Sequence, residues 1–186
     1  MKKILQEKGN IVLHSPTKEI PIKDITSPKI KKIIKEMSEA LSSQDDGVAL
    51  AGPQIGYPLS IFIVSGKIFD KDFIKGKKAI SEDTEDLKTK KRKIRIPDMV
   101  YINPKISKLS KEKAWLPEGC LSNRWFYGNV YRSKKATVTA YDENGKKFTR
   151  GASGLLAQIF QHETDHLRGI IFTEKAKDLV EELPFS

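Results

Sequence analysis

Residues 162–166 read His-Glu-Thr-Asp-His, and this pentapeptide constrains the fold more than any other segment. Two histidines four residues apart share one face of a helix, where both imidazoles can bind one metal ion. Glu163 is rotated roughly 100° from His162 about the helix axis. Its carboxylate can therefore take a proton from a water whose pKa the metal lowers. The pattern predicts metal-dependent amide hydrolysis; the alternative is a helix with two partly buried histidines and a surface glutamate.

Apolar residues recur at helical spacing in two segments, which predicts two helices. The first covers about 28–43, with Ser27 as its N-cap and Pro28 at its first position. The second covers 155–167 and ends at Gly169. Short apolar or alternating segments predict strands at 59–64, 100–102, 137–141, 146–150 and 170–172.

Strands joined by short turns, such as the turn at 142–145, are typical of hairpins. Hairpins with two segregated helices predict an α+β fold rather than a doubly wound parallel sheet. We therefore expect antiparallel β-sheets packed around a central metal-binding HExxH helix, with a further helix near the N-terminus. Residues 66–98 are highly charged and are predicted to form a solvated insertion within a single domain over 1–186.

The net charge of +10 can attract polyanions such as RNA, although a lysine-rich solvated surface explains it equally well. No RNP1 or GXXG motif accompanies the charge, so sequence-specific nucleic-acid binding is not expected. No run approaches 18 apolar residues, and the N-terminus lacks the features of a signal peptide. A single cysteine, Cys120, excludes internal disulfides. We expect a cytoplasmic monomer with no membrane span.

A catalytic metal needs a third protein ligand and an open coordination position. Phe172 stands where the HExxHxxGxxH pattern has its third histidine, and His14 is expected to be a surface or packing residue. Cys120 could supply a thiolate for Zn or Fe(II), although a lone cysteine is usually structural. Three glutamates after the helix also remain conceivable ligands: Glu174, Glu181 and Glu182.

Three segments resemble the motifs of peptide deformylases, in the order of that family. Residues 47–56 read GVALAGPQIG and look like the family's GxGxAAPQ segment. Residues 118–122 match its EGCLS motif, and residues 161–166 match its QHExDH motif. The resemblance covers nearly all the chain apart from the charged insertion and the final dozen residues. It implies removal of the formyl group from the N-terminal formyl-methionine of nascent polypeptides, with release of formate.

The resemblance also implies the roles of individual residues. Glu163 would be the general acid and base, and the charge on the formyl oxygen would be stabilised by the Gln54 amide and the Leu121 backbone N–H. The ion would be Fe(II), with Zn, Ni or Co as substitutes. Its ligands would be Cys120, His162 and His166.

The implied substrate site is an apolar pocket beside the metal. The methionine side chain would be lined by Val48, Leu116, Leu155 and Ile159, each of which can equally be an ordinary core residue. Further contacts to the substrate would come from Ala49, Glu118 and Gly119, where Gly119 allows close backbone approach.

Other parts of the chain depart from the family. After Ser122 the family typically continues Val-Pro-Gly, whereas this chain has Asn-Arg-Trp-Phe-Tyr at 123–127. That stretch either flanks the substrate entrance or caps the core, and we favour capping. Some deformylases dock on the ribosome through a basic C-terminal helix, but residues 174–185 are acidic here. Any ribosome contact would use the positive charge of residues 67–95.

Two other functions stay open. A zinc endopeptidase would keep HExxH but lacks the third histidine and leaves Gln54 and Cys120 unexplained. A non-catalytic metal-stabilised or ribosome-binding protein would have no use for the carboxylate of Glu163.

Ala49 stands where the family usually has Gly, and Gly52 where it usually has Ala. The methyl added at 49 would crowd the substrate backbone, and the methyl lost at 52 would compensate. We expect activity to survive with altered substrate affinity, so that Ala49→Gly changes kcat/KM for a formylated peptide. An unchanged kcat/KM would dismiss the crowding.

Overall fold

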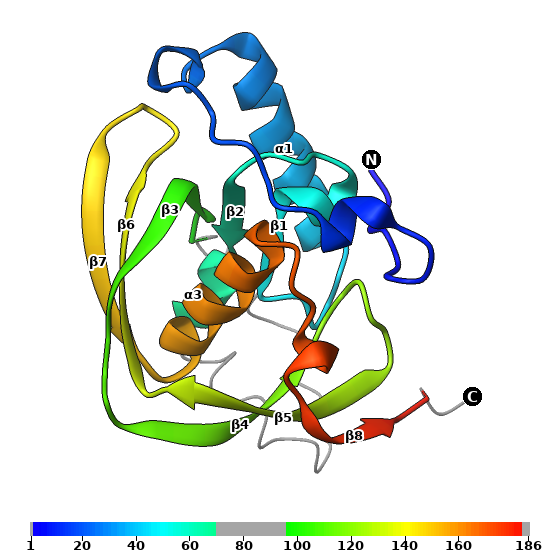
Figure 1. The fold of residues 1–186 in the computed structure, drawn as a ribbon. Helices are drawn as coiled ribbons and strands as arrows, with labels where there is room; N and C mark the ends of the chain where they lie inside the picture. The colour runs from blue at the N-terminus through cyan, green and yellow to red at the C-terminus, as the bar shows by residue number, and fades with distance from the viewer. Residues whose placement is uncertain (1, 70–95, 184–186) are drawn as a thin grey trace, which may run out of the picture.

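Two antiparallel sheets surround a central helix in the computed structural model, which describes residues 2–69 and 96–183 (Figure 1). The five-stranded sheet has the order β1-β2-β3-β6-β7, and the three-stranded sheet has the order β4-β5-β8. The insertion expected at 66–98 lies outside the described residues except at its two ends. The strands of the larger sheet are β1 Ala49–Ala51, β2 Ile61–Val64, β3 Met99–Leu109, β6 Lys135–Tyr141 and β7 Lys147–Ser153. Those of the smaller sheet are β4 Lys113–Gly119, β5 Phe126–Ser133 and β8 Lys177–Glu181.

Helix α1 covers Pro28–Ser42, close to the span expected from apolar periodicity. The Ser27 hydroxyl accepts a hydrogen bond from the Ile30 N–H at 3.4 Å, which satisfies one of the free amides at the helix start. The buried face of α1 packs with Leu50, Ile61 and Ile63 in one core cluster. That face consists of Ile30, Ile33, Met37, Ala40 and Leu41.

Helix α3, Gly154–Leu167, carries the HExxH pentapeptide through the middle of the molecule (Figure 1). It contacts strands of both sheets, including β1, β6 and β7 of the larger one and β5 of the smaller one. Phe160 is fully buried and packs against the stacked rings of Phe62 and Tyr101. A helix enclosed in this way holds its polar side chains in a fixed interior position.

The expected strand at 170–172 is wrong. Ile171 and Phe172 are buried in a small core cluster with Leu13 and Val130, and Phe172 opens the 3-10 turn Phe172–Glu174. The last strand of the described chain is instead β8, which pairs with β5 and is exposed along its whole length. An exposed edge strand has no alternation of apolar and polar residues, so periodicity does not reveal it.

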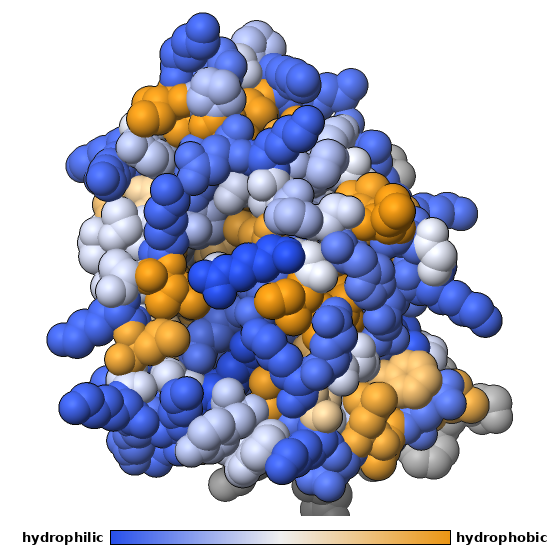
Figure 2. Space-filling view, viewed as in Figure 1, coloured by the Kyte–Doolittle hydropathy of each residue, from blue (hydrophilic) through white to orange (hydrophobic). Residues whose placement is uncertain are grey.

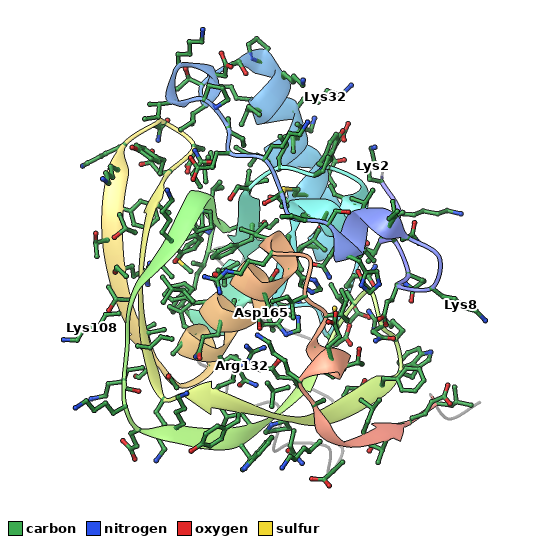
Figure 3. The ribbon with its side chains drawn as sticks, viewed as in Figure 1. Lys2, Lys8, Lys32, Lys108, Arg132 and Asp165 are labelled. Atoms are coloured by element: carbon green, nitrogen blue, oxygen red, sulfur yellow. The ribbon has the colours of Figure 1, made fainter. Side chains whose placement is uncertain are left out.

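Several of the lysines that contribute to the positive net charge lie on the surface. Figure 2 shows a largely hydrophilic face with scattered apolar side chains. Lys2, Lys8, Lys32 and Lys108 point away from the body of the molecule, whereas Arg132 lies inside it (Figure 3). No helix among the described residues is both long and apolar enough to cross a membrane.

Gly154, the first residue of α3, and Gly169, just after its end, provide a matched test of how this helix is held. Gly169 has φ +75°, and a Cβ there would lie 2.6 Å from the carbonyl carbon of His14. Gly154 has φ +58° with open space around it. We expect Gly169→Ala to lower the free energy of unfolding by about 3 kcal/mol, since strain and overpacking add. Gly154→Ala should cost about 1 kcal/mol. Urea denaturation measures both, and equal losses would contradict the close packing at Gly169.

Candidate active site

The end of β4 meets α3 at a cluster of three potential metal ligands. The ligand atoms of Cys120, His162 and His166 all lie within 4.8 Å of one another, and Cys120 Sγ is 3.2 Å from His166 Nε2. The two histidines come from one face of α3, and Cys120 directly follows β4. A thiolate with two imidazoles fits a divalent transition metal, so the donor set suits the metal that the sequence predicts.

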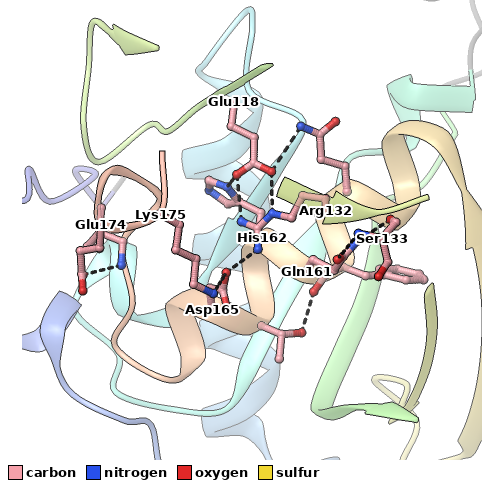
Figure 4. Close-up of polar contacts among 12 residues, drawn as sticks. Glu118, Arg132, Ser133, Gln161, His162, Asp165, Glu174 and Lys175 are labelled. Carbon is pink, nitrogen blue, oxygen red and sulfur yellow. Dashed lines mark hydrogen bonds and ion pairs between the residues drawn. The ribbon is translucent and has the colours of Figure 1, made fainter. Parts of the chain in front are cut away.

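Glu118 fixes the orientation of His162 (Figure 4). Its Oε2 lies 3.0 Å from His162 Nδ1. Burial opposes ionisation of Glu118, but hydrogen bonds from Arg132 and His162 outweigh it and lower the pKa of Glu118 to about 2. An ionised carboxylate can only accept, so Nδ1 of His162 carries a proton. When the ring is neutral, the lone pair of Nε2 is then free for a metal ion.

Arg132 joins the two sides of the site through buried ion pairs (Figure 4). Its Nε and Nη2 donate to Glu118 at 2.8 and 2.9 Å, and its Nη1 donates to Asp165 Oδ2 at 2.5 Å. Lys175 donates to the same Asp165 oxygen at 2.7 Å from the segment before β8. The side chains of Glu118, Arg132 and Asp165 are each at most 8% exposed. Buried charges in this number are tolerated only when each is paired.

Glu163 is buried next to this network. Its Oε2 makes no hydrogen bond within the described part of the chain. Burial raises the pKa of Glu163 to about 7, while the nearby charges of His162 and Glu118 act in opposite directions. A carboxyl group with such a pKa can both accept and release a proton near neutral pH.

Gln54 points its amide nitrogen toward the cluster. Its Oε1 accepts a hydrogen bond from the Ala51 N–H at 2.8 Å, which fixes the side chain against the backbone of the 3-10 turn Gly52–Ile55. Its Nε2 lies 3.2 Å from Ser122 Oγ and 3.5 Å from Cys120 Sγ. Leu121 follows Cys120 and also borders the site.

A cavity of about 420 Å³ opens onto these groups. Gln54 and three segments line it: residues 46–49, residues 117–121 with 123–127, and the face of α3 that carries His162. Most of the residues expected at the substrate do line the cavity: Val48, Ala49, Glu118, Gly119, Leu155 and Ile159.

Leu116 is not among the described residues that line the cavity, contrary to expectation. It is half-buried and lies opposite Val130 in the β4–β5 pair. The cavity reaches only the last residues of β4, so a side chain further back in the strand does not contact it.

The space at Gly52 is already filled. A Cβ there would lie 2.9 Å from the Tyr57 carbonyl oxygen and 3.1 Å from that of Leu59. The methyl absent at 52 therefore leaves no void beside Ala49.

Several residues of the site carry no signal in the sequence. Arg132 and Lys175 belong to segments without a recognisable motif. Gln158 could have been found, because it lies four residues before His162 on the same face of α3, and it donates to Glu118 Oε1 at 3.3 Å. His14 stays on the surface, 3.8 Å from Glu7 and 3.9 Å from Glu174.

Comparisons with known proteins agree with the motifs. The family model described as polypeptide deformylase matches residues 1–182. Peptide deformylase 1A, chloroplastic, from Solanum lycopersicum is 38% identical over 167 residues, which cover 90% of this chain and 57% of that protein. The chain thus spans little more than half the length of that relative. A peptide deformylase from Christiangramia forsetii is 34% identical over 177 residues, covering 94% of this chain and 82% of that protein.

Solved structures give the same picture. The peptide deformylase from Synechococcus elongatus in complex with actinonin has a TM-score of 0.70 at 30% identity, covering 94% of this chain and 78% of that one. A peptide deformylase from Legionella pneumophila has a TM-score of 0.74 at 28% identity, covering 96% of this chain and 87% of that one.

The buried ion pairs of Arg132 predict a large effect on stability. Arg132→Met would leave the carboxylates of Glu118 and Asp165 without their shared cation, and we expect a loss of about 3–5 kcal/mol in the free energy of unfolding. Arg124→Met is the matched control, because Arg124 pairs with Asp46 at 2.7 Å at a partly exposed position. It should cost about 1 kcal/mol or less. Urea denaturation of the metal-free proteins measures both, and a small loss for Arg132→Met would refute the role of the network.

Proposed function

Because the chain belongs to the polypeptide deformylase family, we propose that it is a metallohydrolase that removes the formyl group from the N-terminal formyl-methionine of nascent polypeptides and releases formate. One observation carries this function. A Cys-His-His cluster and an unpartnered buried carboxyl group lie side by side on a cavity large enough for a peptide end. A purely structural metal site would need neither the cavity nor Glu163.

We propose that Cys120, His162 and His166 hold one divalent ion on α3, the central HExxH helix. The ion would act as a Lewis acid toward the formyl oxygen and water. Fe(II) is expected, with Zn, Ni or Co as substitutes, since a mixed thiolate and imidazole set accepts all of them. Glu118 supports this role, because its hydrogen bond at 3.0 Å keeps Nδ1 of His162 protonated and Nε2 available.

Glu163 would move the proton of the reaction. Its Oε2 has no hydrogen-bond partner in ranges 2–69 and 96–183 and can accept a proton from the attacking water. The same oxygen can then deliver that proton to the amine of methionine as the C–N bond breaks. Burial excludes competing solvent around this carboxyl group, which is 4% exposed.

Gln54 and Leu121 would stabilise the negative charge that builds on the formyl oxygen. The Gln54 amide is already oriented, since its Oε1 is bound to the Ala51 N–H and its Nε2 is directed at the cluster. The Leu121 N–H makes no hydrogen bond to another described residue and is available as a second donor. Donors fixed before the reaction begins need no reorganisation as charge develops.

The methionine side chain would occupy the apolar part of the cavity. Val48 approaches it from the segment before β1, and Leu155 and Ile159 approach it from one face of α3. Ala49, Glu118 and Gly119 would border the peptide backbone.

We further propose that residues 1–186 form one deformylase-like domain, to which the charged insertion at 66–98 is an addition. The remaining expectations stay predictions: a cytoplasmic location, a monomeric state and contact with the ribosome through basic surface.

Glu163→Gln separates proton transfer from metal binding. We expect kcat for formate release from formyl-Met-Ala to fall at least about 100-fold, because the amide cannot accept the proton. Metal content should stay unchanged, whereas Cys120→Ser should lose metal as well as activity. Glu143→Gln, at an exposed turn position, is the matched control and should behave like the parent protein. Full activity of Glu163→Gln would rule out the proposed role.

The same assay distinguishes the other functions. Formate release identifies a deformylase. Cleavage of internal peptide bonds without formate release would favour an endopeptidase. Neither activity in a protein with its full complement of metal would favour a non-catalytic protein and overturn the proposal.

A further inference from the structure

Gln158 lies in the wall of the active-site cavity, and the proposed steps of the reaction make no use of it. It is half-buried on α3, four residues before His162. Its amide nitrogen donates two hydrogen bonds, one to the Pro117 carbonyl oxygen at 2.8 Å and one to Glu118 Oε1 at 3.3 Å. Both acceptors belong to the end of β4, so one side chain joins the helix to the strand.

Contact with a methionine side chain does not explain an amide at this position. Leu155 and Ile159, which line the same cavity from α3, are apolar. A half-buried amide beside an apolar pocket costs free energy unless its donors are bonded. The nitrogen of Gln158 is bonded, and both of its acceptors lie on β4. The bonds to β4 therefore account for the amide.

These bonds join the two segments that carry the candidate ligands. Cys120 directly follows β4, whereas His162 and His166 are on α3. Among the hydrogen bonds of the described chain, those between α3 and β4 all come from Gln158 and His162. Besides the contact of His162 with Glu118, Gln158 is thus the direct polar link that holds the end of β4 against the helix.

The bond to Pro117 does something that the ion pairs of Glu118 do not. Arg132 donates to both oxygens of the Glu118 carboxylate, at 2.8 and 2.9 Å, and would keep that charge paired without Gln158. The Pro117 carbonyl is part of the backbone, three residues before Cys120, so a bond to it restrains the main chain itself. Loss of this bond would shift the thiolate rather than leave a buried charge unpaired.

We propose that Gln158 is a positioning residue of the metal centre: its amide ties the backbone of β4 to α3 and so keeps the Cys120 thiolate within reach of the ion that His162 and His166 bind. Loss of a group that orients metal ligands typically weakens metal binding by about 10- to 100-fold. This inference rests on the metal site of the proposed function and adds to it a residue that touches neither metal nor substrate.

Gln158→Met tests the link, because methionine has nearly the same length and volume but donates no hydrogen bond. The zinc affinity of the metal-free protein, with its thiol kept reduced, is measured by competition with a chromophoric chelator. We expect the Kd for zinc to rise about tenfold, at the lower end for groups that orient ligands, since Glu118 and Arg132 stay in place. Gln158→Leu should show the same loss.

Cobalt(II) reports on the thiolate itself. A bond between Co(II) and a thiolate gives an intense charge-transfer absorption in the near ultraviolet. At saturating Co(II) that band should be weaker or shifted in Gln158→Met, because the sulfur of Cys120 is no longer held in place. A role of Gln158 in stability alone would leave the band unchanged.

Gln161→Met is the matched control, because it makes the same substitution on the same helix. The Gln161 amide bonds to Ser133 and to the Ala157 carbonyl oxygen, and not to β4. Since Gln161 is buried, its loss should lower the free energy of unfolding more than Gln158→Met does, as urea denaturation of the metal-free proteins measures. Its zinc affinity and Co(II) spectrum should stay close to those of the parent protein.

The outcomes separate this inference from the function on which it rests. An unchanged zinc Kd and Co(II) spectrum in Gln158→Met would overturn the positioning role and leave the deformylase intact. Equal losses of zinc affinity in Gln158→Met and Gln161→Met would overturn it as well, since any weakened helix would then weaken the site. Failure of the parent protein to bind zinc or Co(II) would contradict the metal site itself, and the inference with it.

Discussion

One guanidinium, that of Arg132, connects the parts of the molecule that must meet at the active site. It comes from β5 and binds Glu118 at the end of β4 and Asp165 on α3. Glu118 stands two residues before Cys120, and Asp165 stands directly before His166. These ion pairs therefore fix the position of the smaller sheet relative to the central helix. Removal of one partner would leave an unpaired charge in the interior. The positions of the three potential ligand atoms of Cys120, His162 and His166 depend on this arrangement.

The network also explains why the site tolerates so much buried charge. Glu118 and Asp165 carry two negative charges, and Arg132 with the half-exposed Lys175 supplies two positive ones. The charges of these four side chains therefore sum to zero. Burial raises the pKa of the neighbouring Glu163 to about 7. The four paired charges balance one another, so none of them fixes the protonation of Glu163. A proton shuttle requires a side chain of this kind.

The sequence predicted those features whose cause is local. Helical periodicity located α1 and α3, and the four-residue spacing placed His162 and His166 on one face. Cys120 had only the weak signal of a lone cysteine, and the resemblance to the deformylase motifs selected it over the glutamates that follow the helix. Arg132 could not be found at all, because β4–β5 pairing brings it to Glu118, 14 residues away, and the packing of α3 brings it to Asp165, 33 residues away. The sequence analysis also missed strand β8 and wrongly placed Leu116 at the cavity, for a related reason. Edge pairing and the extent of a cavity are properties of the assembled sheets.

Departures from the deformylase motifs gather on the cavity walls rather than at the ligands. Ala49 and the segment 123–127 line the opening, whereas Cys120, His162, His166 and Glu163 match their motifs. A changed wall alters which side chains can approach the centre without altering how the amide is broken, since binding away from the reacting atoms and chemistry at those atoms are separable contributions. The pairing of Arg124 with Asp46 removes charge from that wall and leaves aromatic surface. Discrimination among substrates would therefore depend on these walls, while the proposed chemistry would stay with the centre that Arg132 holds together.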